Sequence, residues 1–557
     1  MEAVLPKSIN YLDTLPKAIP SERKRRNFFA ANGTQYRPGQ TIIIEVQDTR
    51  AFLDTQSSFL RFTLTNQSAA LPGGLGNFQP EFGGGYACIR NFRVQQAGNT
   101  IMNIQEYSRL YNAIIGPVTG GRNWKSAQSV YQQVPMYGNR ITSVGNTPNA
   151  PATAGESDGA LFASSNVPCL ANALLNPGES AQFCVPLIGG LFSQSKLIPL
   201  PMLNQPIQLI FDLHDAVQFG VYDFEPTSQS MLISNVRYCA EMVEVPRDVL
   251  GFLATQQAAH GGSLVVAASS YEYQRANLEA GATGTQILEI PSRKKSIKSI
   301  QFVAMADSST IAQFANGALN PGTGLPAGSS TKDVFSQSCS ANPCLVSYQL
   351  RAGSMVIPPT AIQGPGGRNA GNGFAVRAGS APVPANANGV GGLPNAESNK
   401  GESAFELSKA FGHLGTTIGM GACNRLTYAN PEADGGGVSV GTNWIAGQGS
   451  MTAGLDVIAP ATGIVAGGLV GQWNFCPFAL DLEAYQNQAL NSGIDTKSLS
   501  LQMQLHLVLD NTLSVPDTGA GGLAAAGGQS SPINFDIYSY HDILYYFNSD
   551  GTITFSD

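Results

Sequence analysis

Four consecutive basic residues stand out near the start of the chain: Arg23, Lys24, Arg25 and Arg26. Adjacent guanidinium and ammonium groups could contact nucleic acid, an internal membrane or another protein. A charged arm that simply stays in solvent explains the run equally well. Residues 1–38 are rich in proline and lack apolar periodicity, so we expect them to form an arm that is disordered until it meets a partner.

Two cysteines could form a disulfide. Cys339 and Cys344 flank the short sequence Ser-Ala-Asn-Pro in a loop, and they could bridge under oxidising conditions. The other six cysteines are widely spaced, and several lie in strand-like runs, so we expect buried free thiols. The first residues show no apolar run behind a basic region. This predicts synthesis without a signal peptide, in a reducing compartment.

Other reactive chemistry is hard to find. The five histidines are scattered, no P-loop sequence occurs, and neither HExxH nor a pair of CxxC motifs is present. We therefore expect no catalytic residue, cofactor, metal or small-molecule substrate, and predict that the protein is not an enzyme. The net charge is −7 and charged residues make up 12% of the chain, which argues against a broad nucleic-acid-binding surface.

The elements that would position these residues are mostly strands. Runs rich in β-branched and aromatic residues, several with apolar residues at every second position, predict strands. Helical spacing of apolar residues predicts one helix. Pro246 is expected to open a second, short helix, and a third is expected after the equivalent strand of the second half. The expected strands lie within residues 40–47, 59–65, 87–95, 181–187, 207–213, 230–245, 262–278, 285–305, 346–357, 499–509 and 533–555, and the helices within 103–115, 247–259 and 402–414.

The order of these elements is duplicated. Each half shows strands, then a helix and a long loop, then more strands, and each half has enough strands to close a two-sheet sandwich. Residues 116–178, 359–401 and 430–468 are long segments rich in Gly, Asn, Pro, Ser or Ala. Because buried loops leave backbone groups unpaired, these segments should project from one end of two sandwiches that stand side by side.

Stretches spread over most of the chain resemble the double jelly-roll major capsid proteins of the adenovirus and PRD1-type lineage, especially those of virophages and polinton-like viruses. No single stretch is diagnostic, but their order and spacing together are specific. The stretches are residues 59–65, 89–94, 185–213, 236–254, 290–305, 347–359, 402–412, 480–510 and 535–555.

This resemblance implies an all-β fold of two tandem eight-stranded jelly-roll sandwiches with short helices and long inserted loops. It also implies homotrimeric, pseudo-hexameric capsomers that tile the icosahedral shell of a double-stranded-DNA virus, so that the chain is located in the virion. The implied partners are other copies of the chain, neighbouring capsomers, penton proteins and minor capsid proteins, with a possible inner-face contact to genome DNA or an internal membrane.

The expected division of the chain is an arm at residues 1–38, a first jelly roll at 39–246, a connecting helix at 247–259 and a second jelly roll at 260–557. A carbohydrate- or receptor-binding viral spike, similar to a lectin, is the alternative, because jelly rolls serve both roles. The duplication favours the capsid role. Three chains with two similar sandwiches each give six-fold-like contacts, which a lectin does not need.

Overall fold

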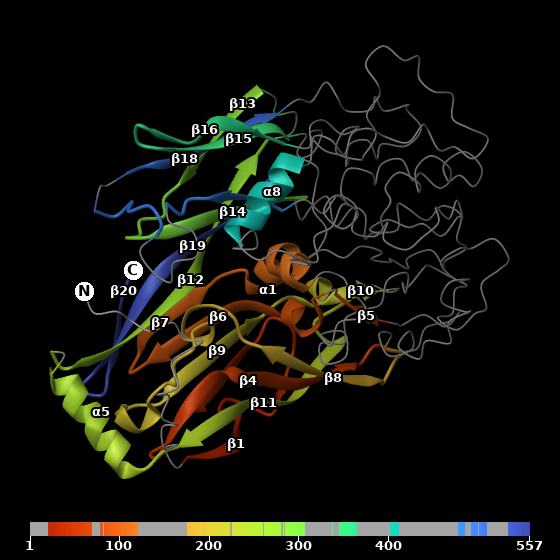
Figure 1. The fold of residues 1–557 in the computed structure, drawn as a ribbon. Helices are drawn as coiled ribbons and strands as arrows, with labels where there is room; N and C mark the ends of the chain where they lie inside the picture. The colour runs from red at the N-terminus through yellow and green to blue at the C-terminus, as the bar shows by residue number, and fades with distance from the viewer. Residues whose placement is uncertain are drawn as a thin grey trace, which may run out of the picture.

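The structure is a computed structural model. It describes residues 21–69, 78–81, 83–120, 175–222, 226–259, 261–279, 282, 284–306, 337, 345–364, 401–411, 477–484, 492–498, 501–509 and 533–557. Most of these residues lie in antiparallel sheets, which form two sandwiches joined by one helix (Figure 1).

The first sandwich packs two sheets face to face. Its first sheet has the strand order β1-β11-β4-β8, with short β2 also pairing β11, and its second sheet has the order β3-β9-β6-β7. Strands β5 (Phe78–Pro80) and β10 (Gly220–Tyr222) form a separate ribbon. The other bounds are β1 Glu22–Phe29, β2 Gln35–Tyr36, β3 Thr41–Val46, β4 Ala51–Asn66, β6 Ile89–Gln96, β7 Asn99–Ile104, β8 Ser180–Pro186, β9 Ile207–Leu213 and β11 Met231–Glu244.

The second sandwich repeats this plan. One sheet has the order β12-β19-β14-β17, with β20 added beside β19, and the other has the order β13-β18-β15-β16. The bounds are β12 Ser263–Leu278, β13 Gly284–Ile290, β14 Ile297–Ala306, β15 Leu345–Ala352, β16 Met355–Gln363, β17 Phe478–Asp481, β18 Met503–Leu509, β19 Ile533–Asn548 and β20 Ile553–Ser556.

The two sandwiches have the same topology. If the main strands of each are numbered in chain order, leaving out β2, β5, β10 and β20, both have one sheet ordered 1-8-3-6 and one ordered 2-7-4-5. Strand β1 therefore corresponds to β12, β7 to β16 and β11 to β19. The duplicated order expected from the sequence is thus present in the strand pairing itself.

Helices occupy matching places in the two sandwiches. After the fifth strand of the first, α1 (Tyr107–Arg109) continues into the π-helical η3 (Leu110–Gly120); after the fifth strand of the second comes α8 (Gly401–Ala410). The helix predicted from residue 103 begins later, because Asn103 and Ile104 end β7. Helix α5 (Arg247–Ala259), which lies between β11 and β12 in the chain, has the predicted bounds. Short 3-10 helices are η2 Gly84–Cys88, η4 Gly190–Phe192, η5 Leu200–Met202 and η6 Ala216–Gln218.

Alternating side chains build the cores. In β4, Leu60, Phe62 and Leu64 are buried, while the residues between them are part-exposed. In β18, Leu505 and Leu507 are fully buried in the second core. The hydrophobic cluster of the first sandwich extends across the junction to residues of β19, so the two sandwiches share buried apolar surface.

Two segments of the second half attach at one end of the second sandwich. Ala306 pairs with Ile533, and Leu345 pairs with Leu509. The chain therefore leaves and re-enters the second sandwich at neighbouring strand ends when it passes through 307–344 and 510–532. Helix α5 lies at the opposite end, next to the turn between β19 and β20, as Figure 1 shows.

Two expectations about segments are wrong. Residues 21–38 are not a disordered arm, because β1 runs through them and pairs with β11 from Glu22↔Glu244 to Phe29↔Arg237. Residues 359–363 and 116–120 are not loop, because β16 continues to Gln363 and η3 continues to Gly120. Most of 116–178 and 359–401, and all of 430–468, lie outside the described residues, so their roles as projecting loops stay predictions, as do the domain boundaries.

Candidate functional site at the junction of the sandwiches

The predicted basic run lies in an edge strand. Strand β1 ends the order β1-β11-β4-β8, so only one of its edges pairs with another described strand. The four basic side chains remain 50 to 58% exposed, yet each forms an ion pair. The pairs join Arg23 to Asp54 at 2.7 Å, Lys24 to Glu22 at 2.7 Å and to Glu244 at 3.2 Å, Arg25 to Glu241 at 2.6 Å, and Arg26 to Asp48.

These ion pairs make the basic run a poor binding site for phosphate groups. Each exposed pair contributes little to stability, about 0–1 kcal/mol. Together, however, the carboxylates of β1, β4, β11 and Asp48 neutralise the run. An unpaired cluster of cations, the kind that attracts phosphate, is therefore not what the fold presents here.

The structure describes only some of the other residues that could be reactive. Cys339 and Cys344 lie outside the described residues, so their disulfide stays a prediction. Cys88, Cys184 and Cys239 are free thiols, and burial raises the pKa of Cys88. Gly-X-Ser-X-Gly, the sequence around the nucleophilic serine of many hydrolases, occurs at residues 155–159 and 437–441, and both segments lie outside the described residues. Among the residues that are described, no group of three or more His, Cys, Asp or Glu could hold a metal ion.

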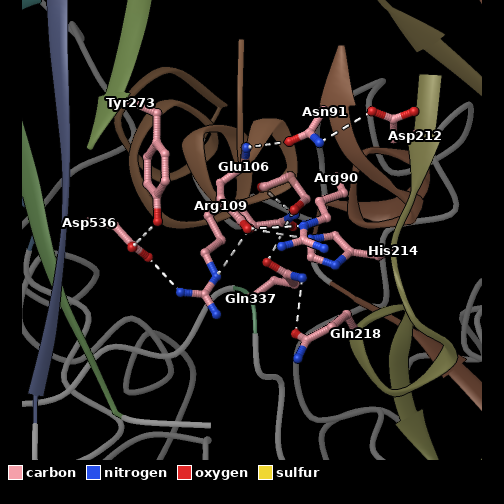
Figure 2. Close-up of polar contacts among 12 residues, drawn as sticks. Arg90, Asn91, Glu106, Arg109, Asp212, His214, Gln218, Tyr273, Gln337 and Asp536 are labelled. Carbon is pink, nitrogen blue, oxygen red and sulfur yellow. Dashed lines mark hydrogen bonds and ion pairs between the residues drawn. The ribbon is translucent and has the colours of Figure 1, made fainter. Parts of the chain in front are cut away.

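A buried ionic cluster joins the two sandwiches. Arg109, in α1 of the first sandwich, reaches Asp536 in β19 of the second, with 2.6 Å between Nη1 and Oδ2 (Figure 2). Asp536 is fully buried. Its Oδ1 also pairs with Arg275 Nε at 3.0 Å and accepts a hydrogen bond from the Tyr273 hydroxyl at 2.7 Å, and both of these residues belong to β12. The carboxylate is thus surrounded by donors from both sandwiches.

Local backbone geometry sets up this cluster. Glu106 lies between β7 and α1 with φ of +46°, a left-handed conformation that turns the chain sharply from strand into helix. Its backbone N–H donates to the Asn91 side chain, and its carbonyl accepts from Tyr538 of β19 at 2.9 Å. The turn therefore aims α1 and Arg109 at the second sandwich.

Glu106 is the second carboxylate of the cluster. Arg90 Nε lies 3.3 Å from Oε1, while His214 Nε2 lies 3.5 Å and Arg109 Nε 3.9 Å from Oε2. Burial alone would raise the pKa of Glu106, but His214 and the two arginines outweigh it and lower the pKa to about 2. Burial lowers the pKa of His214, and the neighbouring Glu106 carboxylate opposes this shift.

Arg109 keeps its charge although its side chain is only 8% exposed. Burial by itself would lower its pKa, but the charges of Asp536 and Glu106 outweigh that effect and raise it. Both carboxylates are salt-bridged to arginine side chains, so the arrangement suits a structural clamp better than proton transfer.

A second set of contacts closes the junction near the β19–β20 turn. The Gln96 side chain donates to the Gly551 carbonyl at 3.0 Å and accepts from the Ile553 N–H at 2.6 Å. Gly190 has a φ of +51°, and a Cβ there would lie 2.6 Å from the Tyr545 hydroxyl oxygen. Close backbone approach and paired polar groups together hold the sandwiches in one orientation.

The junction also has an open pocket at its surface. This pocket of about 380 Å³ beside the cluster is lined by Arg90, Asn91, Gln105, Glu106, Tyr273 and Arg275. Sequence reasoning did not single out this region. The available signal was two residues of opposite charge, Glu106 and Arg109, spaced i,i+3 in a predicted helix whose other residues are uncharged. No helix in the described ranges is long and apolar enough to cross a membrane.

Comparison with known proteins identifies the fold. Neither protein-family models nor curated proteins give a match. Among solved structures, the chain is similar to PBCV-1 VP54, described as fitted into a cryo-EM reconstruction of the virophage Sputnik. The TM-score is 0.52 at 9% identity, and the match covers 98% of this chain and 99% of that chain. The chain is a double jelly roll.

Two further similar structures are from virophages. The cryo-EM structure of Sputnik gives a TM-score of 0.48 at 9% identity, covering 100% of this chain and 93% of that chain. The mavirus major capsid protein gives 0.46 at 11% identity, covering 100% and 96%. The fold expected from the sequence, two jelly rolls in tandem, is confirmed by the strand order and the match to VP54.

The low pKa of Glu106 predicts how the double jelly roll responds to acid. A carboxylate whose pKa is about 2 when folded and 4.5 in the reference state stabilises the fold fully above pH 4.5. That stabilisation is lost as the pH falls toward 2. We expect Glu106→Gln to lower the free energy of unfolding by ~3 kcal/mol at pH 6, with a smaller difference at pH 3.

Urea unfolding of both proteins between pH 3 and pH 7 measures this difference. Glu45→Gln removes an exposed carboxylate outside the cluster and controls for the general loss of one negative charge. If Glu106→Gln lowers the free energy of unfolding by the same amount at pH 6 and at pH 3, then Glu106 does not have the low pKa described above.

Proposed function

We propose that the chain is a major capsid protein whose homotrimers form pseudo-hexameric capsomers in the icosahedral shell of a double-stranded-DNA virus. The observation that carries the proposal is the duplicated sandwich, two units of identical strand order fixed to each other by a buried clamp. Three such chains place six similar sandwiches around a closed ring. The role is structural rather than catalytic.

The fold comparison supports the same role. The VP54 structure, which the chain matches over nearly its whole length, is described as fitted into a virophage reconstruction. A carbohydrate- or receptor-binding spike was the alternative. Nothing in the described residues favours it, and the duplication has no evident use in such a protein.

The proposal extends to location and partners. Its partners are other copies of the chain, neighbouring capsomers, penton proteins and minor capsid proteins, and the chain is located in the virion. Because carboxylates neutralise Arg23 to Arg26, we favour a protein partner for β1 over genome DNA or an internal membrane. Cleavage at Arg23–Arg26 by trypsin should then be slower in assembled particles than in free protein.

The oligomeric state tests the proposal most directly. We expect purified protein to have a mass about three times that of the 58.5 kDa chain in light scattering. Negative-stain images of the same sample should show hexagonal outlines. A stable monomer under all solution conditions would refute the homotrimer, and trimers without hexagonal outlines would refute the capsomer.

A further inference from the structure

The open pocket beside the buried cluster has an arginine from each sandwich in its wall. Arg90 belongs to β6 of the first sandwich and Arg275 to β12 of the second, and both line the pocket. Their side chains are 55% and 36% exposed, so both guanidinium groups are in contact with solvent. The pocket therefore brings cations of the two jelly rolls together at the surface.

Each of these arginines uses only part of its hydrogen-bonding capacity. Arg90 Nε donates to Glu106 Oε1 at 3.3 Å, and Arg275 Nε donates to Asp536 Oδ1 at 3.0 Å. Within the described part of the chain, no group accepts from the Nη nitrogens of either side chain. Most of the N–H donors of an arginine are on these nitrogens. Both residues can therefore still bind an acceptor from outside the chain.

The charges of the cluster do not cancel. Its cations are Arg90, Arg109 and Arg275, and its carboxylates are Glu106 and Asp536 (Figure 2). Three guanidinium groups thus accompany two carboxylates, and one positive charge remains. Arg109 is buried between the two carboxylates, whereas Arg90 and Arg275 reach the pocket. The excess charge is therefore located at the pocket.

Neighbouring titratable groups do not supply the missing negative charge. His214 lies beside the cluster and is either neutral or positive. Asp212 is paired with Arg93 at 3.1 Å. Glu272, also in β12, lies 3.9 Å from Lys294. An anion from outside the chain would complete the charge balance.

We propose that this pocket binds a single carboxylate group. A carboxylate offers two oxygens in one plane, which matches the fork of N–H donors on an arginine. Its one negative charge equals the excess on the cluster, and a dianion fits less well because Glu106 lines the same pocket. Gln105, which is exposed in the pocket wall, can donate a further hydrogen bond.

A carboxylate bound between Arg90 and Arg275 contacts both jelly rolls, so its binding stabilises their junction. The carboxylate can belong to a small free molecule or to an acidic side chain of a polypeptide. Both sources present the same group to the pocket, and they differ only in what is attached to it.

Thermal unfolding of the full chain with added ligand tests the site at constant ionic strength. The probes are sodium acetate, a free carboxylate, and the peptide acetyl-Gly-Glu-Gly-amide, which carries the carboxylate on a polypeptide. We expect at least one of them to raise the unfolding temperature of the wild type until the effect saturates. The neutral peptide acetyl-Gly-Gln-Gly-amide should have no effect. The probe that saturates at the lower concentration identifies the source of the carboxylate.

Substitutions in the pocket wall link this effect to the two arginines. We expect Arg90→Gln to weaken binding ~tenfold, because a hydrogen bond between charged groups is lost. Arg275→Lys keeps a cation beside buried Asp536 but loses the planar fork, and a similar weakening is expected. Arg351→Gln is the matched control, since it removes an exposed strand arginine that lies outside the pocket and donates to the Gly353 carbonyl. Its binding should equal that of the wild type.

Three results would overturn the proposal. The first is that neither probe raises the unfolding temperature of the wild type. The second is that Arg90→Gln binds as well as the wild type, or that Arg351→Gln weakens binding equally. The third is that phosphate at pH 8, where it is mainly a dianion, has a larger effect than acetate. None of these results bears on the proposed capsid role, because every residue of the site belongs to one chain.

Discussion

Leu505→Asp is expected to abolish soluble folded protein. Leu505 is fully buried at the centre of β18, and its register partners on the neighbouring strands are Leu288 and Leu350, which are also buried. An aspartate there would leave a charge, or a protonated carboxyl, without a hydrogen-bond partner. The cost is several kcal/mol, a large part of the ~5–15 kcal/mol by which a domain is stable.

Val508→Asp is the matched control, because it makes the same kind of change on the opposite face of the same strand. Val508 is 36% exposed, so the new carboxylate stays hydrated and the protein should remain soluble. Soluble yield and a near-ultraviolet circular dichroism spectrum measure both variants. Equal solubility of the two variants would mean that the inner face of β18 is wrongly assigned.

Shortening residues 373–398 is expected to have little effect on folding, since loop-closure entropy changes slowly with length. This segment lies outside the described residues. If the deletion unfolds the protein while Leu505→Asp is tolerated, the division of the second half into core and loop is wrong.

Local patterns predicted most of the strands. The alternation in β4 and β18 has a period that only a strand can use to bury one face, so those elements follow from short windows of sequence. Helix α5 begins directly after Pro246, and its predicted bounds match. The duplicated order of elements was also visible, because each element was recognisable by itself.

Strand β1 was missed for a reason that is not local. Seven of its eight side chains are exposed and five are charged, so no apolar periodicity marks it. The carboxylates that pair with Arg25 and Lys24 come from β11, more than 200 residues later in the chain. Only the folded sheet brings these opposite charges together, and a sequence window around residue 25 cannot contain that information.

The contacts of the junction cluster also join residues that lie far apart in the sequence. Arg109 and Asp536 are separated by 427 positions, and the turn at Glu106 that aims Arg109 has an unusual backbone conformation rather than a turn motif. A charge buried as Arg109 is needs a partner. Its identity depended on how the two sandwiches pack.

Arg109→Met is expected to destabilise the protein by about 3–5 kcal/mol, the usual effect of removing one partner of a buried ion pair. Methionine keeps the length of the side chain but leaves Asp536 with only Arg275 and Tyr273 as donors in a fully buried site. Chemical unfolding monitored by fluorescence would measure the change.

Two further variants show whether the loss comes from the buried charge. Arg90→Met removes another arginine of the cluster, but its side chain is 55% exposed, so we expect a loss of at most ~1 kcal/mol. Arg109→Met combined with Asp536→Leu replaces the pair by apolar groups, and we expect it to be more stable than Arg109→Met alone, because the fully buried site then holds no carboxylate that has lost its closest cationic partner. If the double variant is the less stable of the two, or if Arg90→Met costs as much as Arg109→Met, the cluster does not act as a clamp between the jelly rolls.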